Sequence, residues 1–304
     1  PMRSGINLSD KVHAVSPTYA KEILLPNIAE QGYFGGEGLE DDLRLAADSG
    51  RLYGILNGCE YSDQTKVKLS LTELMTLSEN ELIKWVADKP LVDNAHLIAI
   101  TRLKQLSSKN LDKKPIILTS VGRITDQKIR LLQQTMNNGK TAIQTLLTLL
   151  ADDGVFILLG SGDSKLEDFL TQVASTNTNF MFLKGYSEAL SESLYNSGDL
   201  FLMPSSFEPC GISQMLSMRG GQPCLAHRVG GLSDTIIDNQ NGFTFTGGKP
   251  LEQAENMLSC FESALTKKKQ NPQAWEIMSK NALATRFLWR DVAQDYIKYL
   301  YMNS

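Results

Sequence analysis

The chain has 304 residues, of which 42% are hydrophobic and 21% charged, a composition typical of a globular protein with a sizeable core. The net charge of -4 and the lack of Lys/Arg-rich runs argue against nucleic acid as a partner. Apolar runs such as 155–159 are too short to cross a bilayer, and the N-terminus carries no secretion signal, so we expect a cytoplasmic protein without a membrane partner.

Two segments with different patterns occupy the first third of the chain. In residues 10–56 the pattern predicts a short strand, an amphipathic helix and a glycine-rich loop, at 12–15, 19–25 and 32–38. Residues 66–106 predict a helical insert. Within it, Ser78 and Glu81 have the spacing of a helix capping box ahead of an apolar run.

From Lys114 onward, short apolar runs alternate with longer amphipathic stretches. The apolar runs predict buried strands at 115–119, 155–159, 179–183, 200–203 and 223–226. The other stretches predict helices at 131–150 (broken at Asn138-Gly139), 166–174, 188–196, 212–218 and from 232. This alternation predicts an α/β fold with a parallel sheet covered by helices on both faces. The tail, 250–302, is predicted to be helical and to pack through Trp275, Phe287, Trp289 and Tyr296.

The chemistry of such a fold is expected at one edge of the sheet. Ligands bind beyond the carboxyl ends of the strands, near the point where the strand order reverses. The loops that follow the predicted strands are therefore the candidate sites, around Gly122, Gly160, Gly185, Ser205 and Val229.

The loop after the first strand of this sheet combines a glycine, two cations and a helix start. Gly122 lets the backbone turn sharply, and Asp126 or Thr125 can cap the following helix. Arg123 at the strand end and Lys128 in the first helical turn can then point at one place, which suits a diphosphate. The alternative is that both are solvated surface cations, which are common.

Two further loops carry glycines at which a phosphate or a ribose can approach the backbone closely. Gly160 and Gly162 join a predicted strand to a helix, although a plain tight turn explains a lone Gly-x-Gly as well. Gly230 and Gly231 follow another strand and form a second candidate backbone site for an anion.

The segment 204–214 is the most unusual part of the sequence. Glu208 precedes a proline, which disfavours a helix at Glu208 and places it in a loop. Gly211 then opens a helix whose free amides face the same loop, so sugar hydroxyls and phosphate could be bound there. The alternative is a surface loop with a solvated glutamate. Cys210 is interpreted as a small buried residue rather than a nucleophile, because no histidine neighbours it in the sequence.

The cysteines and histidines give no sign of a metal or a disulfide. The four cysteines are scattered without a C-x-x-C pair, which indicates reduced thiols. The three histidines, at 13, 96 and 227, are well separated, and we interpret each as structural. We therefore expect neither a metal nor a cofactor.

Five segments of the sheet region resemble, in order, the C-terminal domain motifs of bacterial glycogen synthases and plant starch synthases. These segments are 121–128, 159–163, 184–188, 207–214 and 230–235. Upstream, 13–22 and 54–58 resemble the end of the family's N-terminal domain and its hinge. The string Phe207-Glu-Pro-Cys-Gly211 is specific to this group, and the resemblance covers nearly the whole chain except 66–106.

The resemblance implies a GT-B architecture, in which two Rossmann-like domains enclose the active site. It implies transfer of glucose from ADP-glucose to the non-reducing end of an α-1,4-glucan, with retention at the anomeric carbon. Arg123 and Lys128 would hold the diphosphate and stabilise the charge on the departing ADP. Glu208 would lie near the glucosyl unit. No Asp-x-Asp string indicates a metal-dependent site.

The resemblance also implies a set of binding residues around these three. Tyr186 matches the aromatic residue that stacks on adenine, and Asn57 matches a hinge asparagine that faces the cleft. Backbone amides near the sugar and phosphate are implied at Cys210, Gly211 and Ile212. The glycines of the binding loops are Gly160, Gly162, Gly185, Gly230 and Gly231.

The sequence departs from the family in a few places. Ile129 stands where the family usually has Gly, Val229 where Thr is usual, and Met215-Leu216 where Leu-Tyr is usual. These differences bear on donor preference and rate rather than on the fold. The family's N-terminal Lys-x-Gly-Gly-Leu loop has no counterpart here, so we expect a truncated donor-binding portion that is inactive by itself.

The expected domains are a remnant of the N-terminal domain, a hinge with the helical insert, a nucleotide-sugar-binding domain and a C-terminal helix that crosses back, at 1–56, 57–113, 114–286 and 287–304. The expected partners are ADP-glucose or ADP and an α-1,4-glucan, and the surface left by the truncation could let the chain self-associate. Two alternatives stay open: a nucleotide-binding module without activity of its own, and a GT-B retaining glycosyltransferase with another donor or acceptor.

Overall fold

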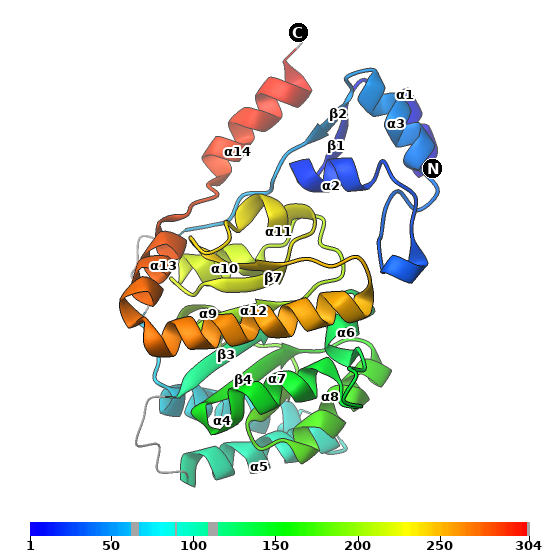
Figure 1. Cartoon of the computed structure of the whole chain (residues 1–304). Helices are drawn as coiled ribbons and strands as arrows, with labels where there is room; N and C mark the ends of the chain where they lie inside the picture. Colours follow the sequence, from blue (N-terminus) through cyan, green and yellow to red (C-terminus); the bar gives the residue numbers. More distant parts are fainter. Residues whose placement is uncertain (62–66, 89, 109–114, 303–304) are drawn as a thin grey trace.

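The computed structural model describes residues 1–61, 67–88, 90–108 and 115–302. Figure 1 shows a large α/β body around one sheet and, above it, a smaller N-terminal part beside which the C-terminal helix runs. The predicted boundary between residues 113 and 114 and the predicted start of the helical insert at residue 66 lie outside the described residues.

Within the described residues, six parallel strands form the central sheet, in the order β5-β4-β3-β6-β7-β8. Their bounds are β3 (Ile116–Val121), β4 (Gly154–Gly160), β5 (Phe180–Lys184), β6 (Leu200–Met203), β7 (Cys224–His227) and β8 (Gly242–Phe245). The strands are almost continuously apolar because both faces of a parallel sheet are covered by helices. The predicted Rossmann-like α/β fold is therefore confirmed.

The two faces of the sheet bury different side chains. The register places Leu118 beside Phe156, and both face one core, whereas Ile117 beside Val155 faces the other. Helices α6, α7, α8 and α12 cover the first face, and α4, α5 and α9 cover the second. Alternation along each strand thus divides the apolar residues between two helical layers.

The helices of the large body span α4 (Leu71–Ala87), α5 (Asn94–Ser108), α6 (Asp126–Gln133), α7 (Ala142–Leu150), α8 (Ser164–Thr176), α9 (Glu188–Ser197), α10 (Ser213–Arg219), α11 (Gly230–Thr235), α12 (Pro250–Gln270) and α13 (Pro272–Ala284). A 3-10 turn, η2 (Ala151–Asp153), precedes β4. Helix α12 starts with a proline at its first position and ends in three lysines, both favourable for the helix ends.

The N-terminal part has a small core of its own. Its elements are α1 (Met2–Leu8), β1 (Val12–Ala14), α2 (Pro17–Glu22), η1 (Ala29–Gln31), α3 (Glu40–Asp48) and β2 (Leu52–Gly54), with β1 and β2 paired in parallel. Helix α2 begins where the Ser16 side chain accepts a hydrogen bond from the Tyr19 amide. Ile6, Ile23 and Leu43 are buried together between the helices and the two strands.

The C-terminal helix lies against this N-terminal part (Figure 1). Helix α14 (Trp289–Tyr296) continues as a π-helix, η3 (Ile297–Tyr301). The ring of Tyr296 lies 4.8 Å from that of His13, and the ring of Tyr299 lies 5.9 Å from that of Tyr53. A Cβ on Gly58 would lie 2.6 Å from the indole of Trp289, so the chain after β2 passes directly against the start of this helix.

The sequence predicted the five strands from β3 to β7 to within two residues of their observed ends. The predicted break at Asn138-Gly139 is confirmed, because α6 and α7 are separate helices and Gly139 in the loop between them has a φ of 76°. Strand β8 was not predicted, because a Gly-Phe-Thr-Phe run is short and starts with glycine. The short elements α1, α3 and β2 were not predicted either.

The predicted capping box was wrong. Ser78 lies inside α4, where it is buried and its hydroxyl donates to the Leu74 carbonyl at 2.7 Å. The capping box is formed by Ser70 and Glu73, whose side chains bond each other's backbone amides. The same Ser-x-x-Glu spacing occurs twice, and the helix begins at the first of them.

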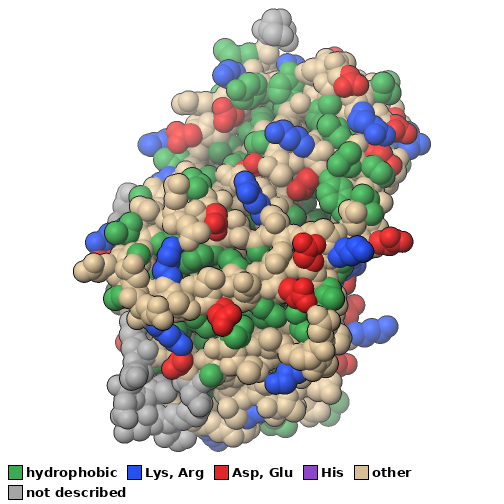
Figure 2. Space-filling view, viewed as in Figure 1, with side chains coloured by type: hydrophobic (Ala, Val, Ile, Leu, Met, Phe, Trp, Pro, Cys, Tyr) green, Lys and Arg blue, Asp and Glu red, His purple; other side chains and the backbone are tan. Residues whose placement is uncertain are grey.

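The surface carries charges of both signs. On the face shown in Figure 2, basic and acidic side chains are interspersed between apolar ones. Of the helices in the described part of the chain, none has both the length and the apolar character that a membrane span needs. All four cysteines are free.

Candidate functional site

The order of the strands reverses between β3 and β6. From β3 the chain moves outward through β4 and β5 and then returns to β6 on the other side of β3. The loops after β3 and β6 therefore leave the sheet in opposite directions and border a crevice. The first loop carries Gly122 and Arg123, and the second carries residues 205–208.

Lys128, in the first turn of α6, lies over the backbone turn that follows β3. A Cβ on Gly122 would lie 3.2 Å from Lys128 Cδ, so the glycine leaves the space that the lysine stem occupies. Arg123 is exposed at the same edge of the sheet. Thr125 occupies the N-cap position of α6, but its hydroxyl is buried and has no partner among the described residues. This corrects the predicted side-chain cap.

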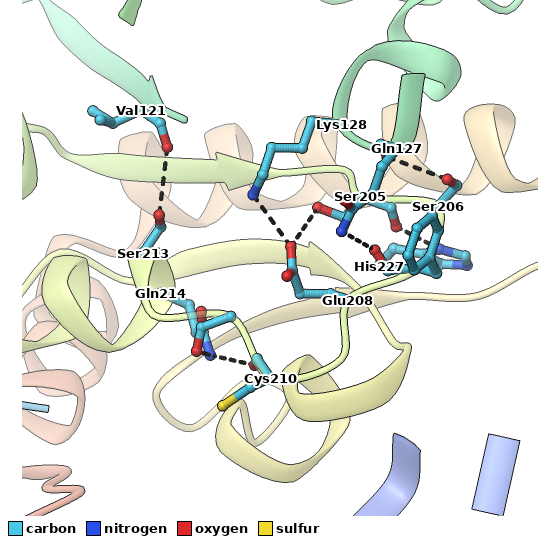
Figure 3. Close-up of polar contacts among 12 residues, drawn as sticks. Val121, Gln127, Lys128, Ser205, Ser206, Glu208, Cys210, Ser213, Gln214 and His227 are labelled. Carbon is cyan, nitrogen blue, oxygen red and sulfur yellow. Dashed lines mark hydrogen bonds and ion pairs between the residues drawn. The ribbon is translucent and has the colours of Figure 1, made fainter. Parts of the chain in front are cut away.

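Glu208 is the acidic partner of this loop (Figure 3). Lys128 Nζ donates to Glu208 Oε2 at 3.2 Å, and Ser205 Oγ donates to the same oxygen at 3.1 Å. Glu208 is only 8% exposed. A carboxylate buried to this extent needs such partners, since an unpaired buried charge is costly. The alternative of a solvated surface glutamate is therefore wrong.

Two residues outside the loop hold residues 205–208 in place (Figure 3). Ser206 N donates to Gln127 O at 2.8 Å, and Gln127 Nε2 donates to Phe207 O at 2.7 Å. His227 Nδ1 lies 3.0 Å from Ser205 O, which can only accept, so this nitrogen carries the proton. Burial lowers the pKa of His227, which keeps the ring neutral.

The sequence predicted a structural role for His227 and a candidate loop around Ser205, but it did not indicate Gln127 or the bond between Ser205 and Glu208. The signals were present but weak. Gln127 directly precedes Lys128, and Ser205 lies three residues before Glu208 in the same loop. Residue type and spacing do not show which side chains form hydrogen bonds with each other, because the partners are up to 80 residues apart in the sequence.

The residues after Glu208 lead into α10. Gly211 has a φ of 72°, which glycine adopts without strain, and Ile212 follows as the exposed N-cap residue. Burial raises the pKa of the Cys210 thiol, and a backbone hydrogen bond from Asn57 acts in the opposite direction. A protonated thiol is a poor nucleophile, in agreement with the interpretation of Cys210 as a buried packing residue. Asn57, in the segment that follows β2, thus lies against this loop.

Gly230 and Gly231 bring the start of α11 against the same loop. A Cβ on Gly230 would lie 1.9 Å from Glu208 O, and one on Gly231 would lie 2.1 Å from Cys210 O. The two amides are already bonded: Gly231 N donates to Glu208 O at 3.0 Å, and Gly230 N donates to Glu22 Oε1 at 2.8 Å. Close packing therefore accounts for both glycines in this structure, and an anion at Gly230 would replace the Glu22 carboxylate.

Helix α2 makes further contacts with these loops. Ser16 Oγ donates to Pro209 O at 2.6 Å. The amide and hydroxyl of Thr18 donate to the two carboxylate oxygens of Asp234 at 2.8 and 2.7 Å. Together with Glu22, these residues tie the N-terminal part to the segments that hold Glu208 and the two glycines.

Two adjoining cavities open at the edge of the sheet, and Arg123 lines both. The smaller, of about 20 Å³, is also lined by Lys128 and Ser205. The larger, of about 410 Å³, is also lined by the loops after β4 and β5 and by helix α9, through Gly160, Ser161, Gly185, Tyr186, Glu188, Ser191 and Glu192. Tyr186 is 75% exposed and borders this cavity with its ring available for stacking.

The loop between β4 and α8 has a packing reason for its glycines. A Cβ on Gly160 would lie 2.0 Å from Gly122 O, and one on Gly162 would lie 2.2 Å from Ile124 O. Gly162 N donates to Glu167 Oε1 at 2.7 Å, so this amide already has a partner. Gly160 borders the larger cavity, and Gly162 is not among the residues that line it.

The geometry brings together most of the predicted site. Two cations and an exposed aromatic ring line adjoining hollows at the switch point, and the buried Glu208 carboxylate pairs with one of the cations, Lys128. Such a site suits a ligand with an anionic centre, a polar end and a flat ring. In the described residues, no group of three or more His, Cys, Asp or Glu could hold a metal ion.

Comparison with known families gives two matches along the chain. The family described as Glycosyl transferases group 1 matches residues 101–276, more than half of the chain. The family described as Starch synthase catalytic domain matches residues 1–45.

Curated relatives are similar over nearly the whole chain. A glycogen synthase of Haemophilus influenzae strain PittGG is 32% identical over 306 residues, which cover 97% of this chain and 57% of the relative. A glycogen synthase of Streptococcus mutans is 30% identical over 312 residues, covering 99% of this chain and 57% of the relative. The chain therefore spans little more than half the length of these relatives.

Solved structures share the fold. The catalytic domain of starch synthase IV from Arabidopsis thaliana, bound to ADP and acarbose, has a TM-score of 0.71 and 28% identity, covering 98% of this chain and 57% of that one. Anabaena HepE in complex with UDP-glucose has a TM-score of 0.57 and 18% identity, covering 97% of this chain and 64% of that one. The second likeness concerns the fold alone.

Proposed function

The chain belongs to the group 1 glycosyl transferases, and from that premise we propose that it is the donor-binding part of a glucosyltransferase of the glycogen synthase type. The proposed donor is ADP-glucose, and the proposed acceptor is the non-reducing end of an α-1,4-glucan, with retention at the anomeric carbon. The starch synthase with the higher TM-score was solved with ADP and acarbose, which supports a nucleotide of this kind.

One observation carries the proposal: Lys128, Arg123 and Glu208 converge where the order of the strands reverses. Lys128 and Arg123 border the smaller cavity from one loop, and Glu208 pairs with Lys128 from the other. We assign the two cations to the diphosphate, because charge-assisted hydrogen bonds to phosphate oxygens are among the strongest in proteins. Their charge would then stabilise the departing ADP as the glycosidic bond breaks.

We assign the larger cavity to the nucleoside. Tyr186 offers a flat ring for the base, and Gly160 and Gly185 line the same cavity with backbone. A cavity of about 410 Å³ falls in the range of ordinary ligand pockets. We assign the amides of Cys210, Gly211 and Ile212, with Asn57 beside them, to the sugar and phosphate side.

Glu208 is the residue that we assign to the sugar. Ser205 and Lys128 both donate hydrogen bonds to its carboxylate, which therefore has a fixed position beside the proposed diphosphate site. Movement of Lys128 to the diphosphate would release one carboxylate oxygen for a sugar hydroxyl. The exchange takes the cation from Glu208, a cost that the charge-assisted contacts of Lys128 with the phosphates have to exceed.

Titration calorimetry with ADP and UDP tests the binding part of this proposal. We expect the unaltered chain to bind ADP more tightly than UDP. Lys128→Ala and Arg123→Ala should each weaken ADP binding about 10- to 100-fold, the loss expected for about 1.5–3 kcal/mol of charge-assisted bonding. Lys280→Ala, on the exposed face of α13, is the matched control and should change nothing. Unchanged ADP affinity in both site variants would return the two cations to the solvated-surface interpretation.

The alternatives are separated by a transfer assay with labelled ADP-glucose and glycogen. Incorporation of label would establish the chain as an enzyme. Nucleotide binding without transfer would favour a nucleotide-binding module, and preference for another nucleotide sugar would favour a different donor. The Lys128→Ala variant serves as the background in each case.

A further inference from the structure

The loop that carries Tyr186 is supported by the helical insert. Residues 185–187 connect β5, which ends at Lys184, to α9, and helices α4 and α5 pack over this part of the sheet. His96 Nε2, on α5, lies 2.9 Å from Lys184 O, which can only accept, so this nitrogen donates. His96 itself is fully buried.

The next residue of the loop lies under an indole ring. A Cβ on Gly185 would lie 2.8–2.9 Å from three ring atoms of Trp85, on α4. Gly185 is not among the glycines with positive φ, so its backbone does not require glycine. The space above its Cα is taken by the indole, which makes Trp85 and Gly185 a matched pair.

A third contact completes the support. Hydrogen bonds from Lys84 and from the Ser187 hydroxyl lower the pKa of Glu81, on α4. Ser187 in turn caps α9, because its side chain accepts from the Leu190 amide. Three residues of the insert, Glu81, Trp85 and His96, therefore contact the residues that flank Tyr186. We call these three residues of the insert the platform.

The other side of the loop is fixed by the sheet. Gly185 N donates to Gly160 O at 3.2 Å, at the end of β4. Tyr186 then projects beyond the loop, 75% exposed, at the border of the larger cavity. A ring held in place before the ligand arrives loses less freedom on binding than a mobile one.

We propose that Trp85 is a positioning residue for the nucleoside: through Gly185, the platform orients Tyr186 and so strengthens binding of the base but not of the diphosphate. This inference rests on the proposed binding of a nucleoside diphosphate sugar at the cavity. The platform lies on the segment 66–106, the part of the chain whose sequence pattern did not resemble the family.

The test compares a ligand that has a base with one that does not. Titrations use ADP directly and inorganic pyrophosphate by competition. Trp85→Ala should weaken ADP binding about tenfold, equivalent to about 1.4 kcal/mol, and leave pyrophosphate binding unchanged. Trp85→Phe keeps an aromatic ring over Gly185 and should restore most of the ADP affinity. Leu77→Ala, another partly buried residue of α4, is the control for general destabilisation.

A second pair of variants tests the route through the loop. Gly185→Ala, which places a methyl group against the indole, should also weaken ADP selectively. Trp85→Ala should cost little more in a Tyr186→Ala background, because both act on the same stacking contact. Circular dichroism confirms that each variant is folded before it is titrated.

The outcomes are distinct. Selective loss of ADP affinity with rescue by Trp85→Phe supports the platform. ADP binding that Trp85→Ala and Gly185→Ala leave unchanged overturns it, as does an equal loss of ADP and pyrophosphate binding. No nucleotide binding by the unaltered chain would overturn the proposed function, and this inference with it.

Discussion

Replacement of Glu208 by Gln is expected to tighten nucleotide binding while it slows turnover. The change keeps the shape of the side chain and removes the charge that pairs with Lys128 at 3.2 Å. At this distance and an effective dielectric constant of about 20, the attraction is about 5 kcal/mol, most of which offsets the desolvation of two largely buried groups. We take the net value as about 1 kcal/mol, the upper end for ion pairs that retain some exposure.

A diphosphate that binds Lys128 breaks the ion pair with Glu208, and the net stabilisation from that pair is then subtracted from the free energy of ADP binding. The Glu208→Gln variant lacks this ion pair, so it should bind ADP about fivefold more tightly. In a transfer-competent form, turnover should fall sharply, because the charge beside the sugar is lost. Titration calorimetry measures the first effect and label incorporation the second.

The matched control for this prediction is Asp199→Asn. Asp199 pairs with Lys268 at 2.8 Å with similar side-chain exposure, and it also accepts from the backbone amide of Ile117, but it lies away from the cavities. Its replacement should leave ADP affinity unchanged. If a folded Glu208→Gln variant bound ADP no more tightly than the wild type, the ion pair between Glu208 and Lys128 would not compete with ADP binding.

Three other predictions concern the support of the site. Gly231→Ala should lower the free energy of unfolding by about 2 kcal/mol or more in urea titrations, because its Cβ would lie 2.1 Å from Cys210 O, whereas Gly5→Ala, with nothing within 4 Å, should not. Burial raises the pKa of Glu22, so its charged form costs stability that grows as the pH rises above the ordinary glutamate range; Glu22→Gln should gain stability over wild type at about pH 7 and little at about pH 4. Burial lowers the pKa of His227, so wild-type stability should fall as the pH drops below about 6.5, and a smaller fall is expected in His227→Gln, measured by urea unfolding at each pH.

The sequence was sufficient for the architecture because burial leaves a local signal. The strands from β3 to β7 are short apolar runs with turn residues at their ends, and their loops had to meet at one edge of the sheet. Strand β8 has too little length for such a signal. The capping box was misplaced because Ser-x-x-Glu occurs twice in the same helix, and only the tertiary packing decides which copy lies inside it.

The site could be predicted only as a set of loops. Arg123, Lys128 and Glu208 were named from their places after strands, but the ion pair between Lys128 and Glu208 depends on side-chain geometry across the crevice. The carboxylate of Glu22 at the start of α11 joins residues 208 positions apart, and no local pattern announces such a contact. Trp85 lies in the segment predicted as a helical insert, and only its contact with Gly185 in the folded chain suggests a role in positioning Tyr186.

We expect the hydrogen bonds between helix α2 and the site loops to set how often the N-terminal part moves away from these loops, which gives an open form of the chain. Helix α2 and its N-cap contribute four of the bonds to the large body: one from Ser16, two from the amide and hydroxyl of Thr18, and one to Glu22. At about 1 kcal/mol each, their loss would cost about 4 kcal/mol, which corresponds to roughly one open molecule in a thousand. A ligand that enters only the open form would show an apparent affinity reduced by that fraction. Thr18→Ala should then raise the apparent affinity of such a ligand without touching a single residue of the cavity wall.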